Sequence, residues 1–184
     1  MPSAGSSIEP ASGPALFDSP SKGADWAKRH GYDLMAQQLE DGMISAEEYE
    51  VSYTAHNSCL ETAGWSFSAT PAVWNPVDHL KLIRQGQGPS SPDLAAEKIC
   101  NEQFDYVDYL FQTTTEAKMD VPLISAVEGC LDENGIPYFR GATNLPELVG
   151  ADAGSSPSAS TIADCVSSQT KLLYPELPAI SIAF

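Results

Sequence analysis

Positively charged residues are scarce in this chain. Its 184 residues include nine Lys and Arg against 25 Asp and Glu, which gives a formal net charge of −16. Such a surface repels the phosphates of nucleic acids and of anionic lipids, so we expect no nucleic-acid partner. The acidity is typical of a solvated surface that keeps an exported protein in solution. Attraction to cations or to a basic partner is the alternative that carboxylate density leaves open.

Long apolar stretches are missing as well. No window approaches the roughly 18 consecutive apolar residues of a membrane-spanning helix, so we predict no direct membrane insertion by the chain as given. The first 26 residues also lack the basic start and the apolar stretch of a signal peptide. The sequence leaves open whether a leader or a lipid anchor preceded Met1.

Catalytic motifs are absent too. The chain has no G-x-S-x-G, P-loop or dinucleotide fingerprint, and His30, His56 and His79 do not show a metal-binding spacing such as H-E-x-x-H. His56 and Cys59 stand three residues apart, as a histidine–thiolate pair would, but His56 falls within an apolar helical stripe typical of a packed side chain. We therefore predict a protein that is not an enzyme and has no cofactor or metal.

One stretch resembles half of a calcium-binding loop. In "EDGMISAEEYE", an alignment on Gly42 puts Glu48 at the bidentate position of an EF-hand. The first and third ligand positions then fall on Gln37 and Leu39, and leucine cannot coordinate calcium. We interpret the stretch as a helix start, in which Ser45 and Glu48 form a capping box.

The four cysteines stand alone, without the C-x-x-C spacing by which tight turns deliver metal ligands. They are Cys59, Cys100, Cys130 and Cys165. An even number of isolated cysteines on apolar helical faces favours two disulfides, and disulfides imply an oxidising compartment. We therefore expect an extracytoplasmic protein, either secreted or attached to the cell envelope.

Hydrophobic periodicity predicts a helix-dominated α+β fold. Residues 1–22, rich in Pro, Ser and Gly, should form a flexible or partner-bound arm, and residues 23–184 a single disulfide-stapled domain. Short helices are expected between residues 25 and 42. Four main helices are expected. Three cover residues 46–63, 121–134 and 161–173, and the other begins at Pro92 with Ser91 as its capping residue. Two or three short strands should come from residues 65–70, 136–141 and 178–184, and one helical turn from residues 76–84.

Two heptapeptides suggest an internal repeat. "CLETAGW" starts at Cys59 and "CLDENGI" at Cys130, and each should end a helix at its glycine. The economical explanation is a duplicated helix–strand–loop–helix unit, with half-repeats at about 44–112 and 120–173. Of the three possible connectivities we predict Cys59–Cys100 and Cys130–Cys165. Closing loops of that size contributes roughly 3 to 4 kcal/mol each in the chain-entropy model.

The segment "QQLEDGMISAEEYEVSYTAHNSCLETAGW" is similar to one in uncharacterised exported proteins and lipoproteins of actinobacteria. There an opening L-x-D-G-x-[IV]-[ST]-x-x-E-Y leads into a helix ending C-[LM]-x-x-x-G. The matching residues here are Leu39, Asp41, Gly42, Ile44, Ser45, Glu48, Tyr49, Cys59, Leu60 and Gly64. The resemblance implies export, often with a lipid anchor ahead of the arm, and it implies no activity.

Two functions fit these observations. The first is an accessory or structural subunit that binds other protein chains of an envelope or membrane assembly. The alternative is a secreted small-ligand or cation-binding module. The long arm and long loops favour the first function, because loops longer than about 15 residues in a compact domain are usually functional or disordered. Aromatic residues within or beside these segments are the candidate interface anchors: Phe17, Trp65, Trp74 and Tyr138.

Overall fold

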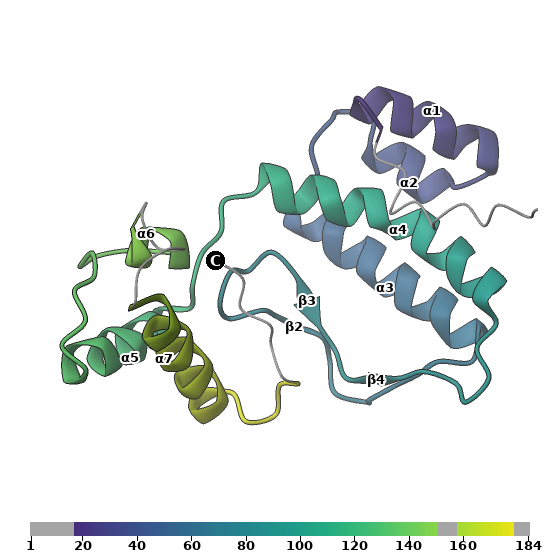
Figure 1. Cartoon of the computed structure of the whole chain (residues 1–184). Helices are drawn as coiled ribbons and strands as arrows, with labels where there is room; N and C mark the ends of the chain where they lie inside the picture. Colours follow the sequence, from purple (N-terminus) through teal and green to yellow (C-terminus); the bar gives the residue numbers. More distant parts are fainter. Residues whose placement is uncertain (1–16, 151–157, 179–184) are drawn as a thin grey trace, which may run out of the picture. The chain divides into compact units, whose positions relative to one another are not determined.

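A computed structural model describes residues 17–150 and 158–178 of the chain (Figure 1). The described residues fall into two compact units. Unit 1 comprises those within Met1–Ala63 and Pro92–Phe111, and unit 2 those within Gly64–Ser91 and Gln112–Phe184. The described residues form seven helices and four two-residue strands, so the predicted helix-dominated α+β fold with small antiparallel sheets is confirmed. The predicted single domain and its half-repeats remain predictions.

Unit 1 begins with two short helices, α1 (Pro20–His30) and α2 (Asp33–Gln38). The Ser19 side chain accepts a hydrogen bond from the backbone of Lys22, so α1 starts inside the predicted arm. Of that arm, residues 1–16 lie outside the described residues. Gly23 permits a close approach within unit 1, because a Cβ atom at this position would lie 2.8 Å from the Tyr106 ring.

Helix α3 (Ala46–Thr62) has the predicted start. The Ser45 hydroxyl accepts from the backbone of Glu48, and the Glu48 carboxylate accepts from the backbone of Ser45 at 2.8 Å. The capping box is therefore confirmed. Tyr49 and Leu60 of the predicted apolar stripe are buried.

Helix α4 (Leu94–Thr114) begins two residues later than predicted. Asp93 replaces Ser91 as the capping residue, because its carboxylate accepts hydrogen bonds from the backbone of Ala95 and Ala96 at 3.1 Å each. Asp and Ser cap helices about equally well, so the sequence pattern did not separate them.

Helices α3 and α4 run antiparallel within unit 1. The Cys59–Cys100 disulfide joins them near the end of α3, with 5.6 Å between the Cα atoms. At their opposite ends the rings of Tyr49 and Phe111 stack with centroids 4.4 Å apart, and the Tyr49 hydroxyl donates to Asp108 at 2.6 Å. The predicted disulfide is confirmed, and aromatic packing extends the contact along both helices.

Unit 2 contains the four strands, which pair as two antiparallel couples. β1 (Ser66–Phe67) pairs with β4 (Gly86–Gln87), and β2 (Val73–Trp74) pairs with β3 (Leu82–Ile83). β1 lies within the predicted strand 65–70. The helical turn predicted at residues 76–84 does not continue as a helix. Instead the chain turns around Asn75, whose backbone carbonyl accepts from His79 at 2.9 Å, and His79 has a φ of +55° that ends the turn.

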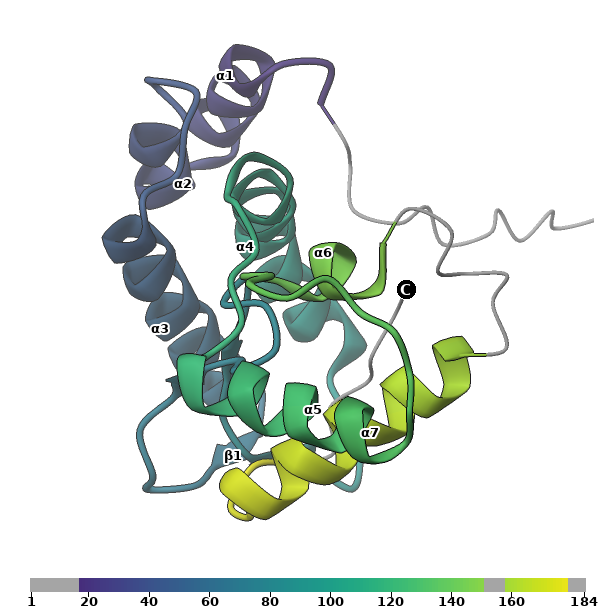
Figure 2. The ribbon, with the colours of Figure 1, turned by 90° about the vertical axis from the view of Figure 1, so that its left-hand side faces the viewer.

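The helical part of unit 2 consists of α5 (Val121–Glu133), α6 (Leu145–Val149) and α7 (Ser158–Leu173). Helices α5 and α7 lie side by side (Figure 2). The Cys130–Cys165 disulfide joins them, as predicted, with Cα atoms 5.8 Å apart. One apolar cluster contains residues from these helices and their surroundings: Val77, Met119, Leu123, Val127, Leu131, Ala142, Leu145, Leu148, Ile162, Cys165 and Val166. The two disulfide-linked helices predicted here are confirmed.

Two details of unit 2 differ from the predictions. Residues 136–141 form no strand, because Pro137 has no N–H to donate. The backbone N–H of Phe139 donates to the Leu148 carbonyl of α6 instead, and that of Ala142 donates to the Phe139 carbonyl in a turn. Helix α6 was not among the predicted helices. The predicted strand at 178–184 falls almost entirely outside the described residues.

The two repeated heptapeptides do end helices. Gly64 and Gly135 both have positive φ angles, +95° and +65°. After Gly135 the backbone N–H of Ile136 donates to Leu131 at 2.9 Å, which returns the chain to the last turn of α5.

Candidate functional site

All four cysteines are paired, and none of the described cysteines is free. In each pair one partner is buried, Cys100 and Cys165 at 2% exposure, and the other is half-buried. A histidine–thiolate site at His56 and Cys59 is excluded in this oxidised state, because the Cys59 sulfur is bonded to Cys100.

Phe17, the candidate anchor within the predicted arm, packs within unit 1. Its ring meets the Tyr106 ring edge-on with centroids 4.9 Å apart, and lies 5.4 Å from that of Trp26. Phe17 is half-buried and acts as an internal contact of the helical unit.

The other three aromatic candidates belong to unit 2 and lie on different segments. Trp65 follows α3 and stacks with Phe67 at 6.3 Å, whereas Trp74 lies on β2. The Tyr138 hydroxyl donates to Asp132 at 3.2 Å, and Arg140 lies over its ring. All three are half-buried.

A polar trio in unit 2 was not predicted. Asp120 lies 2.5 Å from Nε2 of His79 through one carboxylate oxygen, and accepts from the Tyr174 hydroxyl at 2.6 Å through the other. Asp120 precedes α5 but makes no side-chain cap to it, so its carboxylate serves the two distant segments instead. Burial, followed by the hydrogen bond to Asp120, raises the pKa of Tyr174 to about 12.

His79, Asp120 and Tyr174 lie at one end of the pair formed by α5 and α7. Residues 130 and 165 are joined by the disulfide, and residues 120 and 174 by the hydrogen bond, so the helices run antiparallel. At this end three large apolar side chains are exposed: Val121 at 76%, Leu172 at 73% and Leu173 at 40%. We call these three residues the apolar end of unit 2.

Unit 1 contains a small hollow of about 90 Å³ between three segments. The α1–α2 junction, α3 and α4 contribute its lining residues: Gly31, Tyr32, Asp33, Leu34, Met35, Ser52, Ala55, His56, Cys59, Cys100, Gln103 and Phe104. The Cys59–Cys100 disulfide is therefore part of its wall. His56 stacks on Phe104 with ring centroids 4.6 Å apart.

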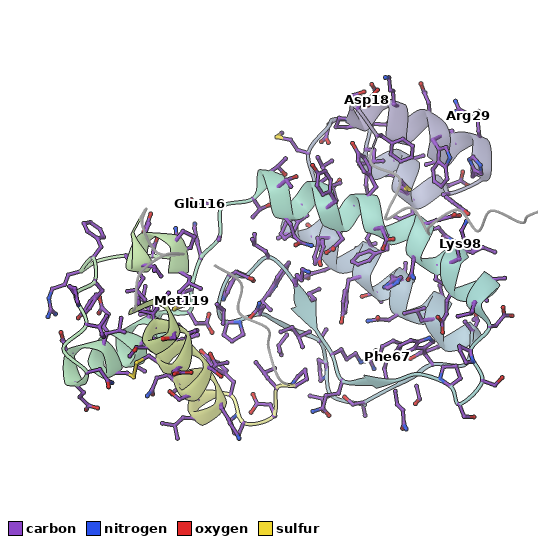
Figure 3. All side chains as sticks on the ribbon, in the orientation of Figure 1. Asp18, Arg29, Phe67, Lys98, Glu116 and Met119 are labelled. Atoms are coloured by element: carbon purple, nitrogen blue, oxygen red, sulfur yellow. A yellow bond between two sulfur atoms is a disulfide. The ribbon has the colours of Figure 1, made fainter. Side chains whose placement is uncertain are left out.

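Asp33 contributes a carboxylate to the lining of this hollow, and Glu102 interacts with Tyr32, another lining residue. Burial raises the pKa of the Tyr32 hydroxyl, and the nearby carboxylate of Glu102 raises it further. Glu102 also pairs with Lys98, which Figure 3 labels on α4. On the same helix burial raises the pKa of Asp105, and the charges of Asp108 and Glu102 add to that effect.

Unit 2 has a groove of about 200 Å³ beside its strands. Arg84 lies in its wall and donates from Nε and Nη2 to the carbonyl of Ser68, at 3.0 and 2.7 Å. Its guanidinium also lies 5.5 Å from the centroid of Phe67. Neither the groove nor the hollow is lined by Trp65, Trp74 or Tyr138, three of the aromatic candidates.

Within the described ranges, no group of three or more His, Cys, Asp and Glu side chains is arranged to hold a metal ion. The resemblance to half of an EF-hand corresponds to the start of α3, where the Glu48 carboxylate binds Ser45 through both its N–H and its hydroxyl.

None of the helices in the described part of the chain has the length and apolar content needed to span a bilayer. Comparisons with protein-family models, with curated proteins and with solved structures find no match to this chain. Its function must therefore be argued from its own residues.

Proposed function

We propose that this protein is an extracytoplasmic accessory or structural subunit that binds other protein chains of an envelope or membrane assembly. The observation that carries the proposal is the apolar end of unit 2. Single exposed leucines are ordinary on a protein surface, whereas several large apolar side chains exposed at one end of a helix pair are a feature of protein–protein interaction sites.

Rigidity makes this end suitable for binding a partner. The Cys130–Cys165 disulfide and the bond from Tyr174 to Asp120 hold α5 and α7 together at two points. Side chains that are already ordered lose little conformational entropy on binding. The backbone that carries Val121 and Leu172 therefore needs no ordering before these side chains bury apolar surface against a partner.

The sizes of the two hollows also favour protein binding over a pocket for a large ligand. Their volumes, about 90 and 200 Å³, fall below the roughly 300 Å³ at which pockets for drug-sized molecules begin. These two hollows therefore fit only very small molecules or single side chains of a partner.

Two further observations support export. Disulfides persist in oxidising compartments, and both pairs join helices whose first cysteine is half-buried. The segment from Leu39 to Gly64 resembles exported actinobacterial proteins, some with a lipid anchor. A protein attached in that way would meet the other chains of the envelope.

Photo-crosslinking in native cells tests the proposal. A photoreactive residue at Leu172 is expected to form adducts with another protein chain. The matched control is Glu133, an exposed residue at the opposite end of α5, which should form few or none.

A second variant tests the energetics. Leu172→Glu places a charge at the apolar end, and we expect co-purification of the cross-linked partner to fall by about tenfold or more while the folded structure is retained. Crosslinking at neither position, together with a protein extracted as a free monomer, contradicts the proposed function.

A further inference from the structure

We infer that the hollow in unit 1 is a binding site for a primary ammonium group, and that its occupant is a lysine side chain of the partner protein. The assignment to a partner's lysine rests on the proposed function. The recognition of an ammonium group does not, because it follows from the lining of the hollow alone.

Three residues that line the hollow each have a hydrogen-bond acceptor for which the described residues provide no partner. These acceptors are the carboxylate of Asp33, an exposed residue, Nδ1 of His56 and Oε1 of Gln103. An alkylammonium group carries three N–H donors and no acceptor. The number and kind of free polar atoms therefore match this group.

The role of His56 is set by its neighbour on α4. Nε2 of His56 lies 3.0 Å from Oδ1 of Asn101, an oxygen that can only accept. Nε2 must therefore carry the proton, and in the neutral ring Nδ1 is left as an acceptor. Gln103 is oriented in a similar way, because its amide nitrogen donates to the Ile99 carbonyl at 3.3 Å.

The volume of the hollow suits the end of a lysine side chain. About 90 Å³ corresponds to roughly three water molecules at their liquid volume. The remaining wall is apolar or weakly polar, with Leu34, Met35, Phe104 and the disulfide, and methylene groups can pack against it.

Charge favours a cation at this place. Unit 1 has fourteen acidic and four basic side chains among its described residues, a difference of ten negative charges. The basic residue of α4, Lys98, is already paired with Glu102. A cationic side chain from outside the unit therefore meets an attractive field without competition from Lys98.

The first experiment titrates the oxidised full-length chain with n-butylammonium chloride and follows backbone amide shifts by NMR. We expect saturable shifts at residues lining the hollow, with a Kd on the order of 1 mM, because so small a ligand has few contacts. n-Butanol lacks the charge and butyltrimethylammonium lacks the donors, so both should bind at least about tenfold more weakly.

Variants locate the site. Asp33→Asn should weaken butylammonium binding by about tenfold, because a charge-assisted hydrogen bond is lost. Asp25→Asn makes the same change of charge at an exposed position on α1 and should alter the Kd less than about twofold. Equal weakening by the two variants, or no saturable shift with the wild-type chain, overturns the inference.

A third experiment distinguishes a free amine from a lysine side chain as the source of the ammonium group. A tripeptide with a central lysine, blocked at both ends, should shift the same amides as butylammonium does. Binding of the free amine without binding of the peptide overturns the assignment to a partner's lysine. If the Leu172 crosslinks are absent but butylammonium binds, the proposed function fails while the ammonium site stands.

Discussion

The two disulfide-linked helix pairs are alike in how they are joined and different in what surrounds them. In both, the first cysteine lies three residues before the end of its helix, and its partner on the second helix is buried. Their Cα separations, 5.6 and 5.8 Å, are nearly the same. The same kind of disulfide therefore joins a helix pair in each unit, although the side chains packed around the two pairs differ.

The contacts along the α3–α4 pair include several aromatic rings among aliphatic side chains. Tyr49 stacks on Phe111 and lies 5.7 Å from Phe104, so ring contacts continue along the helices beyond Cys59–Cys100. The α5–α7 pair packs through aliphatic residues, and its far end is held by the His79–Asp120–Tyr174 trio. The comparison suggests that the disulfide of unit 2 is the less replaceable of the two.

The largest expected effect comes from removing the disulfides one at a time. The variants Cys59→Ala/Cys100→Ala and Cys130→Ala/Cys165→Ala should each lose roughly 3 kcal/mol, or about 10 °C in Tm. Amide hydrogen exchange should then show a difference: α5 and α7 lose protection without their disulfide, while α3 and α4 keep much of theirs. If α3 and α4 lose more protection without Cys59–Cys100 than α5 and α7 lose without Cys130–Cys165, the comparison is wrong.

The next effect concerns the aromatic contacts of unit 1. Phe17→Ala removes a half-buried ring from Trp26 and Tyr106 and should cost about 2 kcal/mol, measured by urea unfolding. Met43→Ala, at a side chain 66% exposed, is the control and should change stability by less than about 0.5 kcal/mol. If both variants change the free energy of unfolding by the same small amount, Phe17 is not part of the core.

The polar trio of unit 2 should respond to alkaline pH. Tyr174 has its pKa raised to about 12, above the ordinary value of about 10. Its contribution to stability is thus fully present below about pH 10 and is lost as pH rises through 12. Tyr174→Phe should cost about 1 kcal/mol at neutral pH and remove this alkaline step from unfolding curves. Identical pH profiles for both proteins contradict the account.

The smallest effect lies on α4. Burial raises the pKa of Asp105, and the charges of Asp108 and Glu102 add to this. A carboxyl with a raised pKa in the folded state stabilises the fold only below its unfolded pKa of about 3.9, and this contribution is lost as pH rises. Asp105→Asn should therefore raise Tm by about 2 °C at neutral pH and leave it unchanged near pH 3. A lower Tm at neutral pH shows that the charge is stabilising instead.

Local patterns in the sequence predicted the parts of the fold that local physics controls. The capping box at Ser45 and Glu48, the glycine ends of α3 and α5 and the cysteine pairing all follow from residues close together in the chain or from helical faces. Helix α6 had a comparable signal that was overlooked. Asn144 accepts from the backbone of Glu147, and Pro146 stands in the first turn.

The candidate sites depend on residues far apart in the sequence, so no local sequence pattern predicted them. His79, Asp120 and Tyr174 come from three segments, and their hydrogen bonds appear only when unit 2 has folded. The hollow in unit 1 likewise needs the α1–α2 junction against α3 and α4. His56 was correctly placed in an apolar stripe, yet its free Nδ1 depends on Asn101 of another helix.

The most direct test of the account is peptide mapping of the protein isolated from its native source, with free thiols blocked and without reductant. Each of the two disulfides joins one helix pair, and together they are the main support for the proposed extracytoplasmic location. We predict one linked peptide pair containing Cys59 and Cys100 and another containing Cys130 and Cys165. Recovery of all four cysteines as blocked thiols contradicts both the stapled architecture and the compartment.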